Sequence, residues 1–281
     1  MQDLACPRSF SRSKHYMVRR ASFPVPLIIF LWAVLCPPPP AAGAHRTLRV
    51  MTYNIHVGVG MDKKLDLKRI AAVIRQQDPD LVGLQEVDRD VERTQRIDEI
   101  AELAKLTHME YAFAYNLHYQ GGQYGVAVLS RFPIMAIDHR RYGNTREKER
   151  RGFIRVEVDM NGHTLNFVTT HLDYQYEDGR IFEARQLLQA LAGIKGPLVV
   201  VGDFNDLPGA EAHQIMTFQF RDAWVESGAQ GEGLSYPSDK PAKRIDYIFY
   251  RATDRIRAGR AWAINTLASD HLPLMAELEI H

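Results

Sequence analysis

Cysteine is scarce in this sequence, because Cys6 and Cys36 are the only two among its 281 residues. Both lie within residues 1–44, whose composition differs from that of the remainder of the chain. Residues 45–281 therefore contain no cysteine, which excludes disulfide bonds, cysteine nucleophiles and cysteine-ligated zinc from that part. The chemistry of this part depends on oxygen and nitrogen side chains.

A long apolar run is also lacking at the N-terminus. The run from Val25 to Cys36 has about a dozen residues, whereas a membrane-spanning helix needs about 20. Basic residues between Arg12 and Arg20 precede the run, and Ala42-Gly43-Ala44 follows it, which is typical of a secretory signal peptide. We expect residues 1–44 to be an N-terminal extension and signal peptide, and residues 45–281 to be a secreted or periplasmic domain. An uncleaved segment that anchors the protein to a membrane surface is the alternative.

An excess of positive charge is the third absence. The whole chain has a formal net charge of +1, and residues 1–44 contain five Lys or Arg against one Asp or Glu. Residues 45–281 are left with 30 basic and 33 acidic residues, a net charge of about −3. Proteins dedicated to duplex DNA usually carry a basic excess that neutralises phosphates. The charge therefore counts against a nuclease without excluding one.

Apolar segments that deliver polar residues recur along residues 45–281. In the strand-like segment from Val199 to Asn205, Asp203 and Asn205 share one face, because side chains alternate along a strand. Each such residue alone is explained by a turn, an ion pair or a buried histidine, but their recurrence predicts a catalytic site. The other strand-like segments present Asn54, Gln85, Glu86, His171, Asp246, Asp270 and His271.

Helical and strand patterns alternate between these segments. Asp66 is placed to cap a helix whose apolar residues Leu67, Ile70, Ala71 and Ile74 recur at helical spacing. Asn161-Gly162 is typical of a tight hairpin turn. We further expect helices around 98–105 and 177–194, and hairpin strands over 153–160 and 164–171.

These residues together resemble a known family. The chain carries Tyr-Asn at 53–54, Leu-Gln-Glu at 84–86, Tyr-Gly-Val-Ala-Val-Leu-Ser-Arg at 124–131, Thr-His-Leu at 170–172, Gly-Asp-Phe-Asn at 202–205, Arg-Ile-Asp-Tyr-Ile at 244–248 and Ser-Asp-His at 269–271. This ordered set is similar to the motifs of the endonuclease/exonuclease/phosphatase superfamily. The resemblance covers roughly residues 47–280 and implies an α/β fold of the deoxyribonuclease I type. That fold is a four-layer α/β/β/α sandwich with two stacked mixed β-sheets.

The residue types indicate a metal-assisted reaction at a phosphate. Asn54, Glu86 and Asp270 offer oxygen donors that suit a hard cation, and we expect Mg²⁺, with Mn²⁺ or Ca²⁺ as alternatives. Histidine can donate to a phosphate oxygen or exchange a proton near neutral pH. Guanidinium groups recognise phosphate, so Arg93 and Arg151 are candidate phosphate contacts.

The resemblance implies a role for each remaining motif residue. Asp246 would orient His271, which would act on the phosphate or as an acid or base. Asp203 would orient the attacking water, and Asn205 would bind the phosphate and donate to the transition-state oxyanion. His171 would be a further catalytic phosphate contact.

Three interpretations of the function are compatible with the sequence. The first is an exported Mg²⁺-dependent phosphodiesterase or phosphatase, acting as a monomer on a small molecule or a lipid headgroup. The second is a secreted endo- or exonuclease that binds nucleic acid, and the third is an inactive phosphate-binding module. Tyr174 and Tyr176 are expected to rim the cleft. The alternating Tyr111, Phe113, Tyr115 and Tyr119 are expected to pack in the core.

Overall fold

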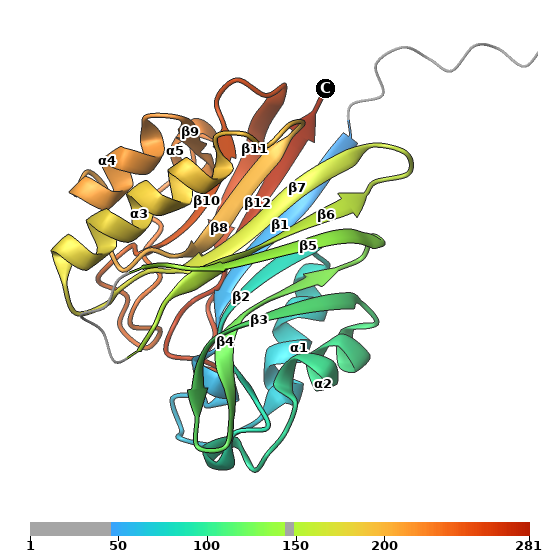
Figure 1. Cartoon of the computed structure of the whole chain (residues 1–281), viewed down its shortest axis with the longest axis vertical. Coiled ribbons are helices and arrows are strands. Elements are labelled where there is room, and N and C mark those ends of the chain that lie inside the picture. The colour runs from blue at the N-terminus through green and yellow to red at the C-terminus, as the bar shows by residue number, and fades with distance from the viewer. Residues whose placement is uncertain (1–45, 144–148) are drawn as a thin grey trace, which may run out of the picture. The chain divides into compact units, whose positions relative to one another are not determined.

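The computed structural model describes residues 46–143 and 149–281 (Figure 1). The predicted signal peptide at residues 1–44 lies outside the described residues. None of the helices in the described part has the length and apolar character needed to cross a bilayer.

Six strands form the first sheet, in the order β11-β12-β1-β2-β4-β3. Strands β1 and β2 are parallel, whereas β1 with β12, and β2 with β4, are antiparallel, so the sheet is mixed. The strands are β1 (Arg46–Asn54), β2 (Leu81–Arg89), β3 (Glu110–Tyr119), β4 (Gly122–Ser130), β11 (Ile256–Ala263) and β12 (Leu274–Ile280).

The second sheet has the order β5-β6-β7-β8-β10-β9 and is also mixed. Its parallel pair is β7 with β8, while β6 with β7 and β8 with β10 are antiparallel. The strands are β5 (Ile134–Arg141), β6 (Gly152–Asp159), β7 (Thr164–His171), β8 (Leu198–Asp203), β9 (Phe220–Asp222) and β10 (Asp246–Arg251).

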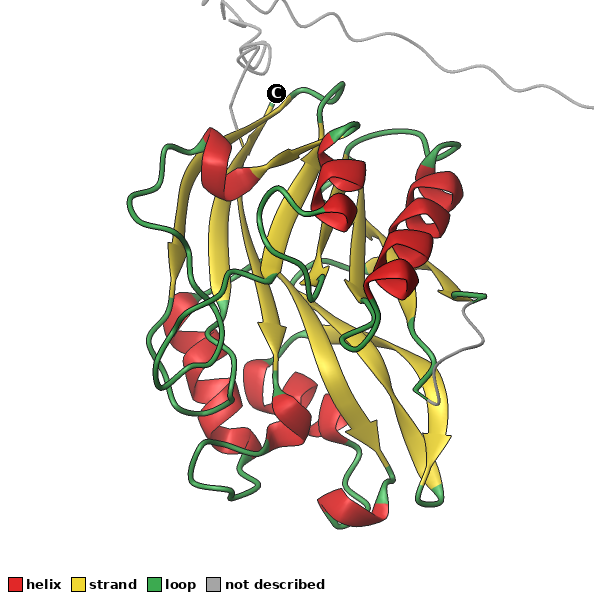
Figure 2. Cartoon of the chain, turned by 90° about the vertical axis from the view of Figure 1, so that its left-hand side faces the viewer, coloured by secondary structure: helices red, strands yellow, loops and turns green. Residues whose placement is uncertain are grey.

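Helices cover the outer face of each sheet (Figure 2). Helices α1 (Leu67–Gln77) and α2 (Glu99–Thr107) pack on the first sheet, and α3 (Glu177–Leu191) and α4 (Glu211–Thr217) pack on the second. The short helix α5 (Ala223–Glu226) contacts β10 and β11. The single-turn 3₁₀ helices are η1 (His56–Gly58) and η2 (Glu92–Thr94).

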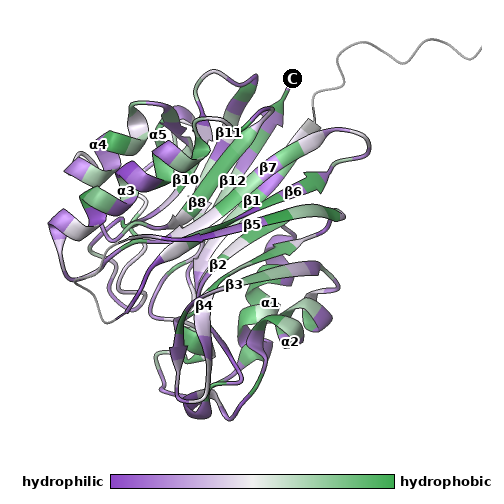
Figure 3. Cartoon of the chain, in the orientation of Figure 1, coloured by the Kyte–Doolittle hydropathy of each residue, from purple (hydrophilic) through white to green (hydrophobic). Residues whose placement is uncertain are grey.

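A core of buried apolar residues lies between the two sheets. It includes Val126 and Val128 of β4 and Val199 and Val201 of β8. Figure 3 shows mainly hydrophobic colours on β8 and β12, whereas α1 and α3 carry both kinds of surface, as helices with one buried face do. The prediction of a four-layer α/β/β/α sandwich with two stacked mixed sheets is confirmed.

The local sequence signals correspond to observed elements. The carboxylate of Asp66 accepts hydrogen bonds from the backbone N–H groups of Lys68 and Arg69, so it caps α1 as predicted. Between β6 and β7, Asn161 and Gly162 have φ angles of 56° and 87°, the positive values that a type I′ turn requires.

One local expectation differs from the structure. We expected Asp246, Asp270 and His271 to be delivered by strand-like segments that end in polar residues. Asp246 instead begins β10, and Asp270 and His271 lie in the loop that precedes β12. Because β10 and β12 run antiparallel to β8 and β1, their starts meet the ends of those strands at one edge of the sandwich.

The two sheets approach closely at Gly83 of β2. A Cβ atom at this position would lie 2.3 Å from Cγ2 of Val201 and 2.8 Å from Cβ of Thr169, both in the opposite sheet. The hydroxyl of Thr169 also accepts a hydrogen bond of 2.8 Å from the buried amide of Gln85. Glycine at this position therefore permits a polar contact between the sheets just below the polar edge.

Substitution Gly83→Ala should destabilise the fold by about 1 to 3 kcal/mol, because the added methyl group overpacks the interface between the sheets. The measurement is urea-induced unfolding followed by circular dichroism. Gly193→Ala is the matched control, since a Cβ at Gly193 has no neighbour within 4 Å. Equal unfolding midpoints for the two variants would contradict the close approach.

Candidate active site

The polar strand ends surround a cleft of about 960 Å³. Two of the predicted site residues, Asn54 and Asp246, are buried and do not line this cleft, but they are hydrogen-bonded to residues that do. The predicted residues that line the cleft are Glu86, Arg93, Arg151, His171, Asp203, Asn205, Asp270 and His271. The structure therefore brings these ten predicted residues together, whereas Gln85 is buried between the sheets and bonded to Thr169.

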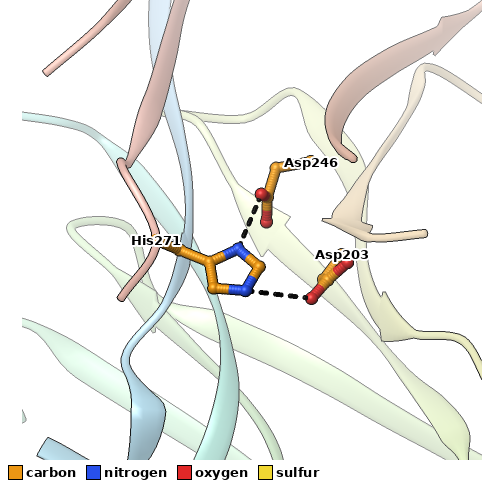
Figure 4. Close-up of side chains that lie close together, drawn as sticks. All are labelled: Asp203, Asp246 and His271. Carbon is orange, nitrogen blue, oxygen red and sulfur yellow. Dashed lines mark hydrogen bonds and ion pairs between the residues drawn. The ribbon is translucent and has the colours of Figure 1, made fainter. Parts of the chain in front are cut away.

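The imidazole of His271 lies between two carboxylates (Figure 4). Its Nδ1 is 2.9 Å from Oδ2 of Asp246, and its Nε2 is 3.7 Å from Oδ2 of Asp203. Burial acts to lower the pKa of His271, but the charges of Asp246 and Asp203 outweigh it and raise the pKa to about 10. The ring is therefore protonated and positively charged at neutral pH, with one N–H held by Asp246.

The carboxylate of Asp203 accepts hydrogen bonds from Asn54, at the end of a strand of the first sheet, and from Asn205, just after a strand of the second. Oδ2 is 3.0 Å from the amide nitrogen of Asn54, and Oδ1 is 2.9 Å from the backbone nitrogen of Asn205. Burial and the nearby charge of Asp246 raise the pKa of Asp203 to about 7, against the lowering effect of His271. Such a carboxylate can gain or lose a proton near neutral pH, as a general base requires.

The tautomer of His171 follows from its neighbours. A guanidinium group can only donate, so Nη1 of Arg151, 2.9 Å away, makes Nδ1 of His171 an acceptor. Burial and the charge of Arg151 hold the pKa of His171 well below its usual range, so the ring is neutral and its proton lies on Nε2. Nε2–H points to Oδ2 of Asp203, 3.4 Å away, whereas the amide nitrogen of Asn205, 3.0 Å away, is itself a donor and cannot accept this proton.

The amide group of Asn205 is oriented by the backbone. Its nitrogen donates to the carbonyl oxygen of Leu172 at 3.0 Å. The same nitrogen lies 3.0 Å from Nε2 of His171, so both contacts fix the amide at the cleft that Asn205 lines. Asn205 also has a φ angle of 50°, a left-handed conformation that asparagine adopts more readily than most residues.

The acidic groups at the cleft fit a hard cation. Glu86 and Asp270 both line it, close to the buried Asp203, so negative charges gather at one place. Glu86 lies at an irregularity of β2 and has a φ angle of 56°, where a side chain is unfavourable unless the surroundings fix it. Oxygen donors of this kind suit Mg²⁺ or Ca²⁺.

Asn54 is placed differently from a simple metal ligand. Its oxygen accepts the backbone N–H of His56 at 3.1 Å, so its nitrogen faces the carboxylates. That nitrogen donates to Glu86 at 3.1 Å and to Asp203 at 3.0 Å. In this arrangement Asn54 holds two carboxylates side by side.

A second group could hold a metal ion. Ligand-type atoms of Asp203, Asp246 and His271 all lie within 4.8 Å of one another. The hydrogen bond from His271 to Asp246 and the raised pKa of His271 favour a protonated ring, which cannot coordinate a metal. Glu86 and Asp270 are therefore the better oxygen donors for a cation.

The two arginines predicted to contact phosphate are bound to carboxylates. Arg93 donates from Nε and Nη2 to Asp88 at 2.7 and 2.9 Å, and Nη1 of Arg151 is 2.9 Å from Oε1 of Glu149. Both line the cleft, but much of their charge is neutralised within the protein. Lys243, which sequence reasoning missed, also lines the cleft and has an exposed side chain.

Two further residues at the site were not predicted. The hydroxyl of Ser269 donates to the carbonyl oxygen of Asn54 at 2.7 Å and accepts from the backbone nitrogen of His271, so it fixes the loop before β12. Its signal was present in the Ser-Asp-His motif. The ring of Tyr236 lies 4.8 Å from that of His271, and nothing in its local sequence marks it.

The aromatic expectations are met only in part. Tyr174 lines the cleft as expected, but Tyr176 is not among its lining residues. Tyr119 lines the cleft, although we expected it to pack in the core. The guanidinium carbon of Arg93 lies over its ring, 4.8 Å from the ring centroid, and this cation–π contact holds the ring at the cleft.

Comparisons with known proteins agree with this geometry. A family model described as endonuclease/exonuclease/phosphatase family matches residues 51–271. The Escherichia coli K12 protein YbhP is 27% identical over 248 residues, which cover 83% of this chain and 97% of YbhP.

Solved structures share the fold. A Beutenbergia cavernae structure described as endonuclease/exonuclease/phosphatase is 25% identical, with a TM-score of 0.67 and coverage of 84% of this chain and 72% of that one. A mannosyl-6-phosphatase of Bacteroides thetaiotaomicron is 16% identical, with a TM-score of 0.68 and coverage of 82% and 99%. The extent of the family match, together with the site it spans, identifies this chain as a member of the endonuclease/exonuclease/phosphatase family.

Proposed function

We propose that this protein is an exported, metal-dependent hydrolase that cleaves a phosphoester bond in a small or lipid-linked phosphate ester. The observation that carries the proposal is the connected set of Asp246, His271, Asp203, His171 and Asn205 at the cleft. Members of the family generally hydrolyse phosphoesters, and the mannosyl-6-phosphatase with the same fold acts, by its name, on a phosphorylated sugar.

The charges of the site suit attack by water on a phosphate. Asp203, with its pKa raised to about 7, would orient the water and accept its proton. The protonated His271 would donate to a phosphoryl oxygen, which favours Asp203 over His271 as the base. The amide N–H of Asn205 that is not bonded to Leu172 would stabilise the developing oxyanion.

Glu86 and Asp270 would hold the cation, with Asn54 fixing Glu86. A bound Mg²⁺ would offset the negative charge of the phosphoryl oxygens. His171 would hold Asp203 through its Nε2–H, and the same edge of its ring contacts the amide of Asn205.

A nuclease is the second candidate. The exposed rings of Tyr119 and Tyr174 line the cleft together with Tyr236, and aromatic rings of this kind can stack on bases. The net charge of about −3 for residues 45–281 counts against this activity. A silent phosphate-binding module is the third candidate, although no motif residue is replaced.

Hydrolysis of bis-p-nitrophenyl phosphate, plasmid DNA and sphingomyelin, each with Mg²⁺ and with EDTA, tests the three candidates. We expect metal-dependent cleavage of the lipid or of the small diester. Cleavage of DNA alone would favour the nuclease. Hydrolysis that EDTA leaves unchanged would contradict the cation site, and no turnover would point to a phosphomonoester or to a binding role.

Asp203→Asn should lower kcat on the cleaved substrate by roughly 10²- to 10⁴-fold, because the variant loses its proton acceptor. Steady-state kinetics with saturating Mg²⁺ measures this, and circular dichroism verifies the fold. Asp239→Asn, at an exposed loop position, is the matched control and should keep full activity. Full activity of Asp203→Asn would refute the assigned site.

Glu86→Gln should raise the Mg²⁺ concentration for half-maximal activity by roughly tenfold or more, since a neutral amide binds the cation more weakly. Titration of EDTA-treated protein with Mg²⁺, and then with Mn²⁺ and Ca²⁺, gives this value. Glu92→Gln alters an exposed carboxylate of η2 and serves as control. An unchanged metal requirement in Glu86→Gln would place the cation elsewhere.

Arg151→Met should release His171 from its single tautomer, because the donor to Nδ1 is lost. Two-bond ¹⁵N–¹H correlation spectra of the ring, assigned with His171→Gln, report which nitrogen carries the proton. Arg155→Met is the control, since Arg155 contacts Glu157 and Asn166 and does not line the cleft. A wild-type ring protonated on Nδ1 would disprove the assignment.

A further inference from the structure

A second hollow of about 590 Å³ lies beside the catalytic cleft. Its walls come from the segment after Asn205, from α5 and from the chain before β10. The larger apolar residues among its lining are Leu207, Pro208, Trp224, Val225 and Leu234. We call this hollow the apolar groove.

The apolar groove adjoins the catalytic cleft, because Leu207 and Lys243 line both. Leu207 follows Asn205 by only two residues, and a chain rises at most about 3.3–3.6 Å per residue. A phosphate bound at Asn205 would therefore lie near the mouth of the groove. A group attached to that phosphate could extend into it without leaving the surface of the protein.

The walls of the groove expose large apolar side chains to solvent. Leu207 is 48% exposed and Val225 is 60% exposed. The indole of Trp224 lies against Gly233, where an added Cβ would be 2.7 Å from the ring. The indole nitrogen, the only polar side-chain atom of Trp224, donates to the carbonyl oxygen of Gly231 at 3.2 Å. Adjacent exposed apolar groups in a hollow are typical of a ligand-binding surface.

The charges of the groove do not suit a polyanion. Arg244 lines it, but Nη1 of Arg244 is 2.9 Å from the carboxylate of Asp222, which neutralises its charge. Among the described lining residues this leaves Lys243, which lines both hollows, and the carboxylate of Glu232 lines the groove as well. A nucleic-acid backbone would need several cations along its path.

We infer that the apolar groove binds an aliphatic arm of the substrate, so that the enzyme selects phosphate esters that carry an apolar chain. The inference rests on the proposed function and adds the class of substrate. The phosphate would lie in the catalytic cleft, Lys243 would mark the junction, and the chain would pack on Leu207, Trp224 and Val225.

Binding of two non-hydrolysable probes, methylphosphonic acid and octylphosphonic acid, to the full-length protein with Mg²⁺ tests this inference. Isothermal titration calorimetry gives both dissociation constants. We expect the octyl probe to bind at least about tenfold more tightly, because burial of two methylene groups already accounts for that factor. Val225→Asp should remove this preference and leave the affinity for methylphosphonic acid unchanged, since Val225 does not line the catalytic cleft.

Phe218→Asp is the matched control, because Phe218 is 86% exposed and lies outside the groove. It should keep the preference for the octyl probe. Val225→Ser provides a milder variant if Val225→Asp does not fold. Equal binding of both probes by the wild-type protein, or an undiminished preference in both Val225 variants, would overturn the inference alone. Failure of both probes to bind would contradict the proposed function as well.

Discussion

The hydrogen bond between Asn54 and Asp203 joins the two sheets at the polar edge of the sandwich. Asn54 ends β1 in one sheet, and Asp203 ends β8 in the other. Glu86 is fixed by the same amide, and Asn205 by the same carboxylate. The site exists only while the sheets keep this alignment, which the close approach at Gly83 helps to set.

The buried carboxylate of Asp246 acts on two neighbouring groups of the site. Burial and the charge of Asp246 raise the pKa of Asp203, and the charges of Asp246 and Asp203 raise that of His271 against the effect of burial. Asp203 thereby becomes able to accept a proton near neutral pH, while His271 keeps its proton. Burial, together with the charge of Arg151, lowers the pKa of His171 and keeps that ring neutral. The protonation state of each imidazole therefore depends on its burial and on the charged residue that contacts it.

The fold was predictable from the sequence because its ordered motifs resemble those of a known family, while the strand-like segments that deliver polar residues predicted one common site. The same argument brought Asp203, His171 and His271 together, although it misjudged which ends of β10 and β12 face the site. The charge partners were not predictable. Asp88 and Glu149 neutralise Arg93 and Arg151 only through contacts that the fold creates.

The side-chain direction of Asn54 and the position of Tyr236 were also beyond the sequence. The first depends on a backbone N–H donated by His56, and the second on a loop that packs against His271. Such contacts have no periodic pattern and no fixed spacing. The residue types at the site could be inferred from the sequence. The neighbours that determine their protonation and side-chain direction are brought together only by the fold.

The left-handed backbone at position 86 favours glycine for folding, whereas the site needs the carboxylate of Glu86. Glycine would occupy this conformation without strain, yet it would remove the carboxylate. The strain is imposed when the chain folds, so the carboxylate already points into the cleft before any ion or ester arrives. Random mutagenesis selected for stability alone should therefore drift toward glycine at this position, and selection for turnover should restore the acid.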